Sequence, residues 1–287
     1  MPELPEVETI RRDLLPVLIG KKITGVSVLH KAPIKDGVKK FQAALRYKTI
    51  RGIERIGKLL MFDLSDGNFL LIHLKMTGQL VYEYDKKFVA GGHSFSSFDA
   101  AALPDRYTWV VVRFNDGSSL YFNDMRKFGY LKIVDIKQKE KIMAGYGAEP
   151  LTKYFTLKNF FNILERRNAP IKSVLLNQSL IAGIGNIYAD EICFEAGIFP
   201  GTKANRLSIV EKNKLFKAIN KILKKAIKYK GTTFKTYIGA GGRKGNFSDF
   251  LRVYQKDGES CTRCRKAIII VKKIGGRSSR YCPVCQK

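Results

Sequence analysis

The chain begins Met-Pro-Glu, and this order places a possible nucleophile beside a possible general acid. Proline at position 2 is compact enough for an aminopeptidase to remove Met1, and removal leaves Pro2 with a free secondary amine. An α-amino group is neutral in about one molecule in ten at pH 7, whereas a lysine side chain is neutral in roughly one in a few thousand. Pro2 can therefore attack a sugar aldehyde near neutral pH and form an iminium ion, and Glu3 can transfer the accompanying proton.

The same segment also fits the proline-punctuated start of a helix. In that interpretation Glu6 and Glu8 complement the helix dipole, and Pro2 has no chemical role. The opening residues alone leave both interpretations open.

Four of the five cysteines have the spacing of a zinc ribbon. They form the pairs Cys261-x2-Cys264 and Cys282-x2-Cys285, with 17 residues between the pairs. Four thiolates would close the coordination sphere of one zinc ion, so the metal would be structural. Disulfides are the alternative, which a reducing compartment disfavours. The fifth, Cys193, lies in an apolar helical pattern and is expected in the core.

The charge of the chain indicates a polyanionic partner. There are 52 Lys and Arg against 25 Asp and Glu, a net charge of +27. Residues 201–287 carry 23 basic and 4 acidic residues, which gives 23 − 4 = +19. Nucleic acid is the expected ligand, with binding that weakens as salt rises. Neither a signal peptide nor a membrane span is recognisable, so we expect an intracellular protein.

Short segments with strand character dominate the first half of the chain. A helix is predicted first, over 7–18, from apolar residues at helical spacing. Turns such as Asp66-Gly67 and Asp116-Gly117 separate the segments that follow, a pattern typical of a β-sandwich. The predicted strands are 22–29, 49–56, 59–64, 69–74, 79–84, 107–114, 119–123 and 129–134.

Helical periodicity replaces the strand pattern beyond about residue 136. The predicted helices are 157–166, 171–176, 186–196 and 208–229. Tyr237 to Gly245 is so rich in glycine that we expect a mobile basic loop. The predicted domains are therefore a sandwich (1–135), a helical domain (136–230), a glycine-rich loop and linker (231–258) and a zinc ribbon (259–287), an α+β fold.

Three segments resemble the formamidopyrimidine-DNA glycosylase family of bacterial repair enzymes. They are Pro2 to Thr9, Gly183 to Glu191 and the four-cysteine ribbon, and they occur in the family's order along the whole chain. The resemblance implies a helix-two-turn-helix element in the helical domain, which grips the DNA backbone together with the ribbon.

The resemblance also implies catalytic roles for particular residues. Pro2 would attack the anomeric carbon of the damaged nucleotide and form a Schiff base, and Glu3 would donate a proton. Lys58 would donate a proton and contact a phosphate, although without the family it would read as an ordinary surface lysine. Arg277, five residues before Cys282, would bind the lesion phosphates and assist the second elimination.

A glycosylase must flip its target out of duplex DNA and fill the space left behind. The resemblance assigns this to Met76, Arg126 and Phe128, where a thioether and a ring can wedge between bases and a guanidinium can pair with the orphaned base. From sequence alone, Met76 and Phe128 fit equally well as core residues.

The remaining contacts expected with DNA come from four residues. Asn186 is suited to cap the helix after the Gly183-Ile184-Gly185 turn, whose N–H groups can bind a phosphate, although a capped helix start is commonplace. Asn168 and Lys172 lie where the family contacts phosphates. Tyr107 stands where many members have a DNA-contacting histidine, in Arg106-Tyr107-Thr108-Trp109, and its hydroxyl can bond a phosphate without carrying charge.

The resemblance implies a bifunctional enzyme that removes oxidised purines from damaged duplex DNA and nicks the strand by β,δ-elimination. It also implies a monomer in the bacterial cytoplasm, associated with the nucleoid. The nearer alternative is an endonuclease VIII-like enzyme for oxidised pyrimidines, which would begin Pro-Glu-Gly-Pro where this chain has Leu4. The other is a catalytically inert zinc-ribbon DNA-binding protein.

Overall fold

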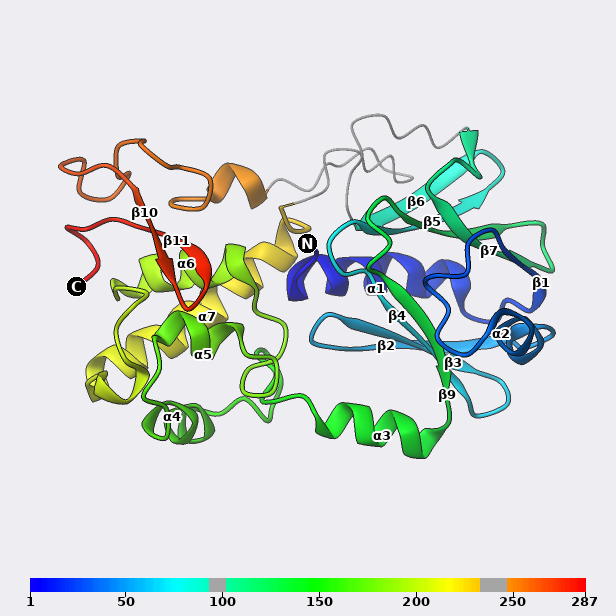
Figure 1. Cartoon of the computed structure of the whole chain (residues 1–287), viewed down its shortest axis with the longest axis horizontal. Coiled ribbons are helices and arrows are strands. Elements are labelled where there is room, and N and C mark those ends of the chain that lie inside the picture. Colours follow the sequence, from blue (N-terminus) through cyan, green and yellow to red (C-terminus); the bar gives the residue numbers. More distant parts are fainter. Residues whose placement is uncertain (93–101, 233–246) are drawn as a thin grey trace. The chain divides into compact units, whose positions relative to one another are not determined.

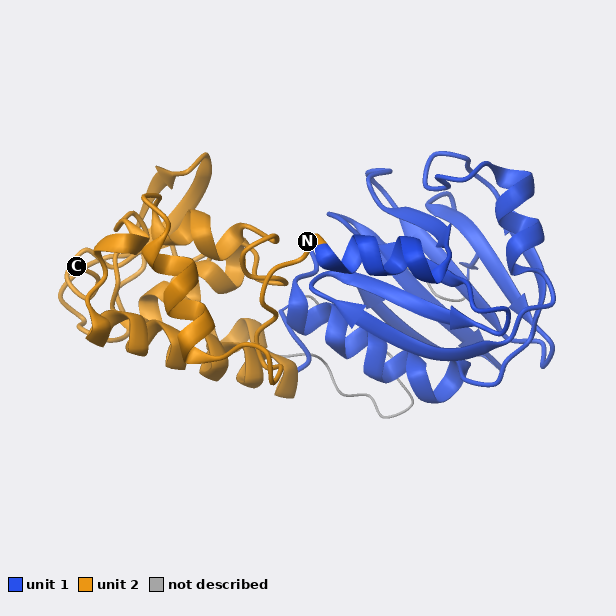
Figure 2. Ribbon diagram, turned by 90° about the horizontal axis from the view of Figure 1, so that it is seen from below, with its two compact units in different colours: residues 1–144, 230–246 blue, residues 145–229, 247–287 orange. Residues whose placement is uncertain are grey.

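The computed structural model describes residues 1–92, 102–232 and 247–287. The chain forms two compact units (Figure 2). Unit 1 consists of Met1–Ala144 and the segment that begins at Lys230, and unit 2 consists of Gly145–Tyr229 and Phe247–Lys287. Within the described ranges, no helix combines the length and the apolar character needed to cross a membrane.

Unit 1 is built on two antiparallel sheets, as the β-sandwich prediction requires (Figure 1). One sheet has the strand order β1-β7-β8-β5-β6 and the other β2-β3-β4-β9. The strands are β1 (Ile23–Val28), β2 (Ile50–Ile56), β3 (Leu59–Leu64), β4 (Phe69–His73), β5 (Gly78–Tyr84), β6 (Lys87–Gly92), β7 (Thr108–Phe114), β8 (Ser119–Asp124) and β9 (Tyr130–Val134).

Helix α1 (Leu4–Leu18) is part of the sandwich core. Its apolar face, with Val7, Ile10 and Leu14, is buried, and the helix contacts β6 of one sheet and β2 and β3 of the other. A Cβ atom at Gly91 of β6 would lie 2.3 Å from Ile10 Cγ1, so only glycine lets the strand approach this closely. The packing fixes the axis of the helix whose first turn follows Pro2 and Glu3.

Two short helices of unit 1 were not predicted, α2 (Val38–Leu45) and α3 (Ile136–Ala144). Lys139 of α3 is buried, with its ammonium 2.6 Å from Glu54 of β2 and 4.0 Å from the centre of the Phe69 ring. These contacts explain why residues 136–144 group with unit 1, although they were predicted to belong to the helical domain.

Unit 2 contains the predicted helices and the cysteine hairpin. Helix α6 ends at Gly197 in the left-handed region, and α7 begins with a capping box between Ser208 and Glu211. The elements are α4 (Leu157–Glu165), α5 (Ile171–Leu176), α6 (Asn186–Ala196), the 3-10 helix η2 (Ala204–Arg206), α7 (Ile209–Lys228), the 3-10 helix η3 (Phe247–Phe250) and the hairpin β10 (Ile270–Ile274) and β11 (Arg277–Tyr281).

The hairpin packs on helix α6 and shares a core with it. Phe194 of α6 lies in one buried cluster with Cys261 and Cys282. The carboxylate of Glu191, also on α6, accepts hydrogen bonds from the backbone N–H groups that lead into the hairpin, those of Arg252, Val253 and Tyr254. Residues 259–287 therefore belong to unit 2.

Candidate functional site

The N-terminal pair is held at the start of helix α1 by Glu6. Pro2 is buried and Glu3 is 2 % exposed. The Glu3 backbone N–H donates to Glu6 Oε2 at 2.9 Å, while Glu6 Oε1 accepts from the backbone N–H of Thr232 at 2.9 Å and from its hydroxyl at 3.2 Å. Glu6, expected only to complement the helix dipole, thus connects the candidate nucleophile to residue 232.

The position before Thr232 requires glycine. Gly231 has a φ of +78°, and a Cβ atom there would lie 2.5 Å from Glu6 Oε1. The expected glycine-rich loop, 237–245, begins a few residues further along and lies outside the described residues.

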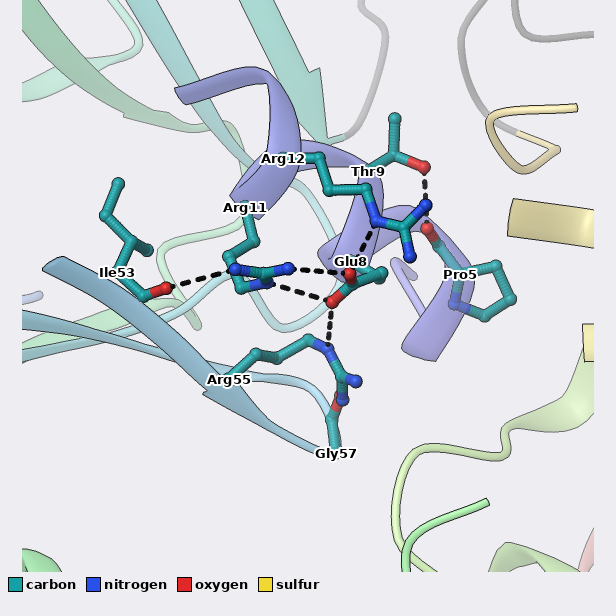
Figure 3. Close-up of polar contacts among 8 residues, drawn as sticks. All are labelled: Pro5, Glu8, Thr9, Arg11, Arg12, Ile53, Arg55 and Gly57. Carbon is teal, nitrogen blue, oxygen red and sulfur yellow. Dashed lines mark hydrogen bonds and ion pairs between the residues drawn. The ribbon is translucent and has the colours of Figure 1, made fainter. Parts of the chain in front are cut away.

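A cluster of arginines around the buried Glu8 carboxylate connects α1 to Gly57, the residue before Lys58 (Figure 3). Glu8 accepts hydrogen bonds from Arg11 and Arg12 on its own helix and from Arg55 of β2, whose guanidinium also donates to the Gly57 carbonyl at 3.0 Å. Burial raises the pKa of Glu8, but hydrogen bonds from Arg11 and Arg12 and the charge of Arg55 outweigh it and bring the pKa to about 2.

Lys58 follows this anchored turn and is 6 % exposed. The structure therefore contradicts its reading as an ordinary surface lysine. Its positive charge affects His73, the last residue of β4. Burial, and then the charges of Lys75 and Lys58, lower the pKa of His73 to about 3. His73 Nδ1 accepts the Lys75 backbone N–H at 3.0 Å, which leaves the proton of the neutral ring on Nε2. His73 had no role among the sequence predictions.

Met76, Arg126 and Phe128 lie on two neighbouring turns that Asp124 joins. The Asp124 carboxylate is buried and accepts from the Thr77 hydroxyl, from the Arg126 N–H at 3.1 Å and from the Gly129 N–H at 2.7 Å. Strands β5 and β8 pair Gly78 with Asp124, which brings the two turns together. Asp124 is the last residue of β8, and its partner Thr77 lies 47 positions away, so sequence spacing alone did not indicate this role.

The side chains on these turns point outward. Met76 is 39 % and Phe128 54 % exposed, so the interpretation as core residues is wrong for both. The Arg126 guanidinium lies 4.9 Å from the centre of the Phe128 ring. The two turns, held by Asp124, thus expose one cation and two large apolar side chains. Such side chains are suited to inserting between stacked nucleobases.

Residues 106–109, where the chain departs from the family pattern, contact the turn that carries Arg126. Trp109 is buried, and its indole N–H donates to the Asp124 carbonyl at 2.8 Å. Tyr107 is half-buried, its carbonyl accepts the Asp124 backbone N–H at 2.9 Å, and the Arg106 guanidinium lies 4.8 Å from its ring centre. Both residues therefore neighbour the turn that carries Arg126.

In unit 2, Lys172 points inward. It is fully buried, with its ammonium 2.7 Å from Asp190 Oδ1 and 2.7 Å from the Ser278 carbonyl of β11. Burial, which disfavours both charges, lowers the pKa of Lys172 and raises that of Asp190. The predicted phosphate contact of Lys172 does not fit this geometry, because its ammonium already holds the hairpin to α5 and α6.

Arg277, by contrast, is exposed at the tip of the hairpin. A Cβ atom at Gly275 of the tip would lie 2.1 Å from Ser173 Oγ of α5, so the tip packs closely on that helix. Lys172 also donates to the Ser278 carbonyl, so the backbone is held in place both before and after Arg277.

The turn before α6 is held by Gln178 and not by Asn186. Gln178 accepts the Gly183 N–H at 2.8 Å and donates to the Ile184 carbonyl at 2.9 Å. Gly185 is the N-cap residue of α6, so the prediction that Asn186 caps the helix is wrong. Asn186 Oδ1 is buried without a hydrogen-bond partner in the described part of the chain, and Asn168 is exposed.

The four paired cysteines converge as a metal site requires. Their Sγ atoms all lie within 4.8 Å of one another, with 3.8 Å between Cys261 and Cys285 and 3.7 Å between Cys264 and Cys282. Sulfurs around a tetrahedral ion with bonds of about 2.3 Å lie about 3.8 Å apart, whereas disulfide sulfurs lie about 2.05 Å apart. The donor set fits one metal ion and excludes the disulfide alternative in this structure.

Comparisons with known proteins agree with this fold. A family model described as the formamidopyrimidine-DNA glycosylase N-terminal domain matches residues 1–131, and one described as the H2TH domain of the same enzyme matches 146–238. The formamidopyrimidine-DNA glycosylase of Pelotomaculum thermopropionicum is 42 % identical, covering 100 % of this chain and 99 % of its own. That of Carboxydothermus hydrogenoformans is 41 % identical, covering 100 % of both chains.

Solved structures give the same result. Lactococcus lactis Fpg in complex with DNA containing an abasic site has a TM-score of 0.86 and 34 % identity, covering 99 % of both chains. The fold, the cysteine site and these matches define a DNA glycosylase. The chain belongs to the formamidopyrimidine-DNA glycosylase family.

Proposed function

We propose that this enzyme removes oxidised purines, 8-oxoguanine and formamidopyrimidines, from duplex DNA and then cleaves the strand as a lyase. The observation that carries the proposal is the buried Pro2-Glu3 pair at the start of α1, in a chain related over its full length to formamidopyrimidine-DNA glycosylases. The net charge of +27 supports a DNA substrate. Its site of action is then the bacterial cytoplasm, where we expect it to act as a monomer.

In the proposed reaction, the secondary amine of Pro2 attacks C1′ of the flipped nucleotide after Met1 is removed. The damaged base leaves with a proton from Glu3. The bond from C1′ to O4′ then breaks, the N–H proton of the bound amine passes to O4′, and the opened sugar is left as an iminium ion on Pro2. This cation acidifies C2′, so loss of a C2′ proton expels the 3′ phosphate, and a second elimination expels the 5′ phosphate. Water then hydrolyses the remaining iminium and frees Pro2.

Three further groups support these steps. Lys58, held beside the Glu8 cluster, would donate a proton and contact a phosphate near the lesion. Arg277, exposed on the fixed hairpin tip, would bind the flanking phosphates and assist the second elimination. Asn168, Asn186 and Tyr107 would contact the DNA backbone, and Met76, Arg126 and Phe128 would fill the space left by the flipped nucleotide.

Zinc is the proposed metal, because four thiolates with this spacing suit Zn²⁺. It would be held by Cys261, Cys264, Cys282 and Cys285 and would stabilise the hairpin without taking part in the reaction. Four protein ligands leave no position for water.

Borohydride reduction on duplex DNA containing 8-oxoguanine tests this function. Protein confirmed by mass to lack Met1 should give a covalent DNA adduct, and peptide mapping should place it on Pro2. Protein with an N-terminal tag, whose Pro2 nitrogen is an amide, is the control and should give none. If the Met1-free protein forms no adduct, the enzyme does not use Pro2 as proposed. Faster trapping on oxidised thymine would instead favour the pyrimidine-specific alternative.

Replacing Asp124 tests the proposed role of the two turns. Asp124→Asn should weaken binding to lesion-containing duplex by more than about tenfold. The carboxylate accepts three hydrogen bonds, and the NH2 group of asparagine would face at least one of these donors with another donor. We expect a loss of stability of about 1–3 kcal/mol as well. Asp85→Asn, at an exposed position, is the matched control. Unchanged lesion binding in a folded Asp124→Asn protein would show that the turns act independently of Asp124.

A further inference from the structure

A row of exposed lysines follows helix α7 of unit 2. The five lysines, separated by 3, 4, 3 and 4 positions, are Lys214, Lys217, Lys221, Lys224 and Lys228. With 3.6 residues per turn, this spacing keeps all five on one face. The opposite face, with Leu215, Ile219 and Leu223, is buried in the core of unit 2. At 1.5 Å per residue the lysine row is about 21 Å long.

Little negative charge from the described residues faces the lysine row. The single acidic residue of α7 is Glu211, which caps the first turn through Ser208. From another element of the described chain, Glu195 of α6 pairs with Lys221 and also lies 3.7 Å from Arg252. The positive charge of the row is therefore largely uncompensated.

A hollow beside the lysine row adds a further cation. It measures about 580 Å³ and is lined by Lys214, Lys217, Lys221 and Arg263 together with Glu195 and Gly197. The Arg263 guanidinium lies 4.2 Å from the centre of the Phe194 ring and donates to the Glu195 carbonyl at 3.4 Å. The hollow is large enough for a phosphodiester group, and the two contacts of Arg263 hold its positive charge in place.

We propose that the lysine row and Arg263 bind the phosphate backbone of a second duplex DNA segment, separate from the segment that carries the lesion. A straight row of single positive charges about 5 Å apart suits a stiff, evenly charged polyanion. A peptide partner would need apolar anchors, but the large apolar side chains exposed on α7, Ile209 and Val210, lie in its first turn before the row.

This surface is distinct from the proposed lesion contacts of unit 2. Cys285 also lines the hollow, so the hollow lies at the end of the hairpin that carries the cysteines. Arg277 lies at the other end, separated from Cys282 by the length of β11, about 17 Å in extended chain. Two duplexes can therefore contact unit 2 at separate places, which would let the enzyme hold one segment while it engages another.

The first experiment measures binding of full-length protein to undamaged duplex DNA over a range of salt. In the row variant, all five lysines are replaced by glutamine, which has similar helix propensity. The control variant carries the same change at five exposed lysines of unit 1: Lys35, Lys39, Lys40, Lys137 and Lys141. We expect the row variant to bind about tenfold more weakly, with a salt slope smaller by about 3, the loss of about three phosphate contacts. Equal affinities and slopes for the two variants would overturn the proposal.

The second experiment detects both segments at once. Wild-type protein is saturated with a short duplex carrying an abasic-site analogue, and a labelled undamaged duplex is then added and followed by native gel mobility. A ternary complex should form with wild type and the control variant and be lost with the row variant. Failure of wild type to form it would refute simultaneous binding, whereas failure of the lesion chemistry alone would leave the salt measurement on undamaged DNA intact.

Discussion

Replacing Glu3 by glutamine is expected to slow base release by about 10²–10⁴-fold, the usual contribution of a positioned general acid. Glu3 is 2 % exposed, and its backbone is fixed by Glu6 at the head of α1. Glutamine has almost the same shape and keeps an acceptor oxygen, but it cannot donate a proton to the departing base. The substitution should therefore remove proton transfer while leaving the helix and the amine of Pro2 in place.

Single-turnover kinetics separate this effect from weaker binding. Base release from an 8-oxoguanine duplex should fall by the expected factor, while the Kd for the same duplex should change by less than about threefold. Glu140→Gln, at an exposed position of α3, is the control and should leave both quantities unchanged. A Glu3→Gln enzyme that releases the base at the wild-type rate would remove Glu3 from the mechanism.

Sequence patterns located elements well where the local signals were strong. Helix α6 has its predicted bounds because Gly185 and Gly197 bracket an apolar segment. Strand β6 was missed because it ends in Ala90, Gly91 and Gly92, residues with low strand propensity. What holds it in the sheet is close packing on Ile10, a contact between residues 81 positions apart that no local pattern shows.

Prediction of the candidate site from sequence was limited in the same way. The convergence of the four paired cysteines could be predicted from the short spacing within each pair. Pro2 and Glu3 are neighbours in sequence, and their catalytic roles stay predictions. The inward orientation of Lys172 could not, since it depends on Asp190 and on Ser278, which are 18 and 106 residues away. Asp124 was missed for a related reason, because its partner Thr77 lies on another turn, 47 residues away.

Loss of the metal should abolish DNA binding by free protein while leaving unit 1 folded. Cys261 and Cys282 are both fully buried in the cluster with Phe194. Without a cation, four thiolates within 4.8 Å would repel one another or have to be protonated. Because structural zinc contributes about 10–16 kcal/mol in small domains, this cluster and the hairpin should disorder together. Arg277 would then lose the strand that positions it.

The variant Cys282→Ser tests this expectation. Metal analysis should find about one zinc per wild-type chain and almost none in Cys282→Ser, and lesion binding should weaken by more than about 100-fold. Cys193→Ala is the matched control, because burial raises the pKa of this fifth thiol and it lies in α6 outside the cluster of four. Its metal content and binding should remain close to wild type.

The order of events distinguishes a structural from a chemical role of the metal. A chelator should prevent free protein from binding DNA, whereas protein already bound to a lesion should complete base release at an unchanged rate, since Pro2 and Glu3 lie in unit 1. Normal DNA binding by zinc-free protein would show that the hairpin folds without the ion. Immediate loss of turnover in preformed complexes would instead place the metal in the reaction, against the closed coordination that four thiolates provide.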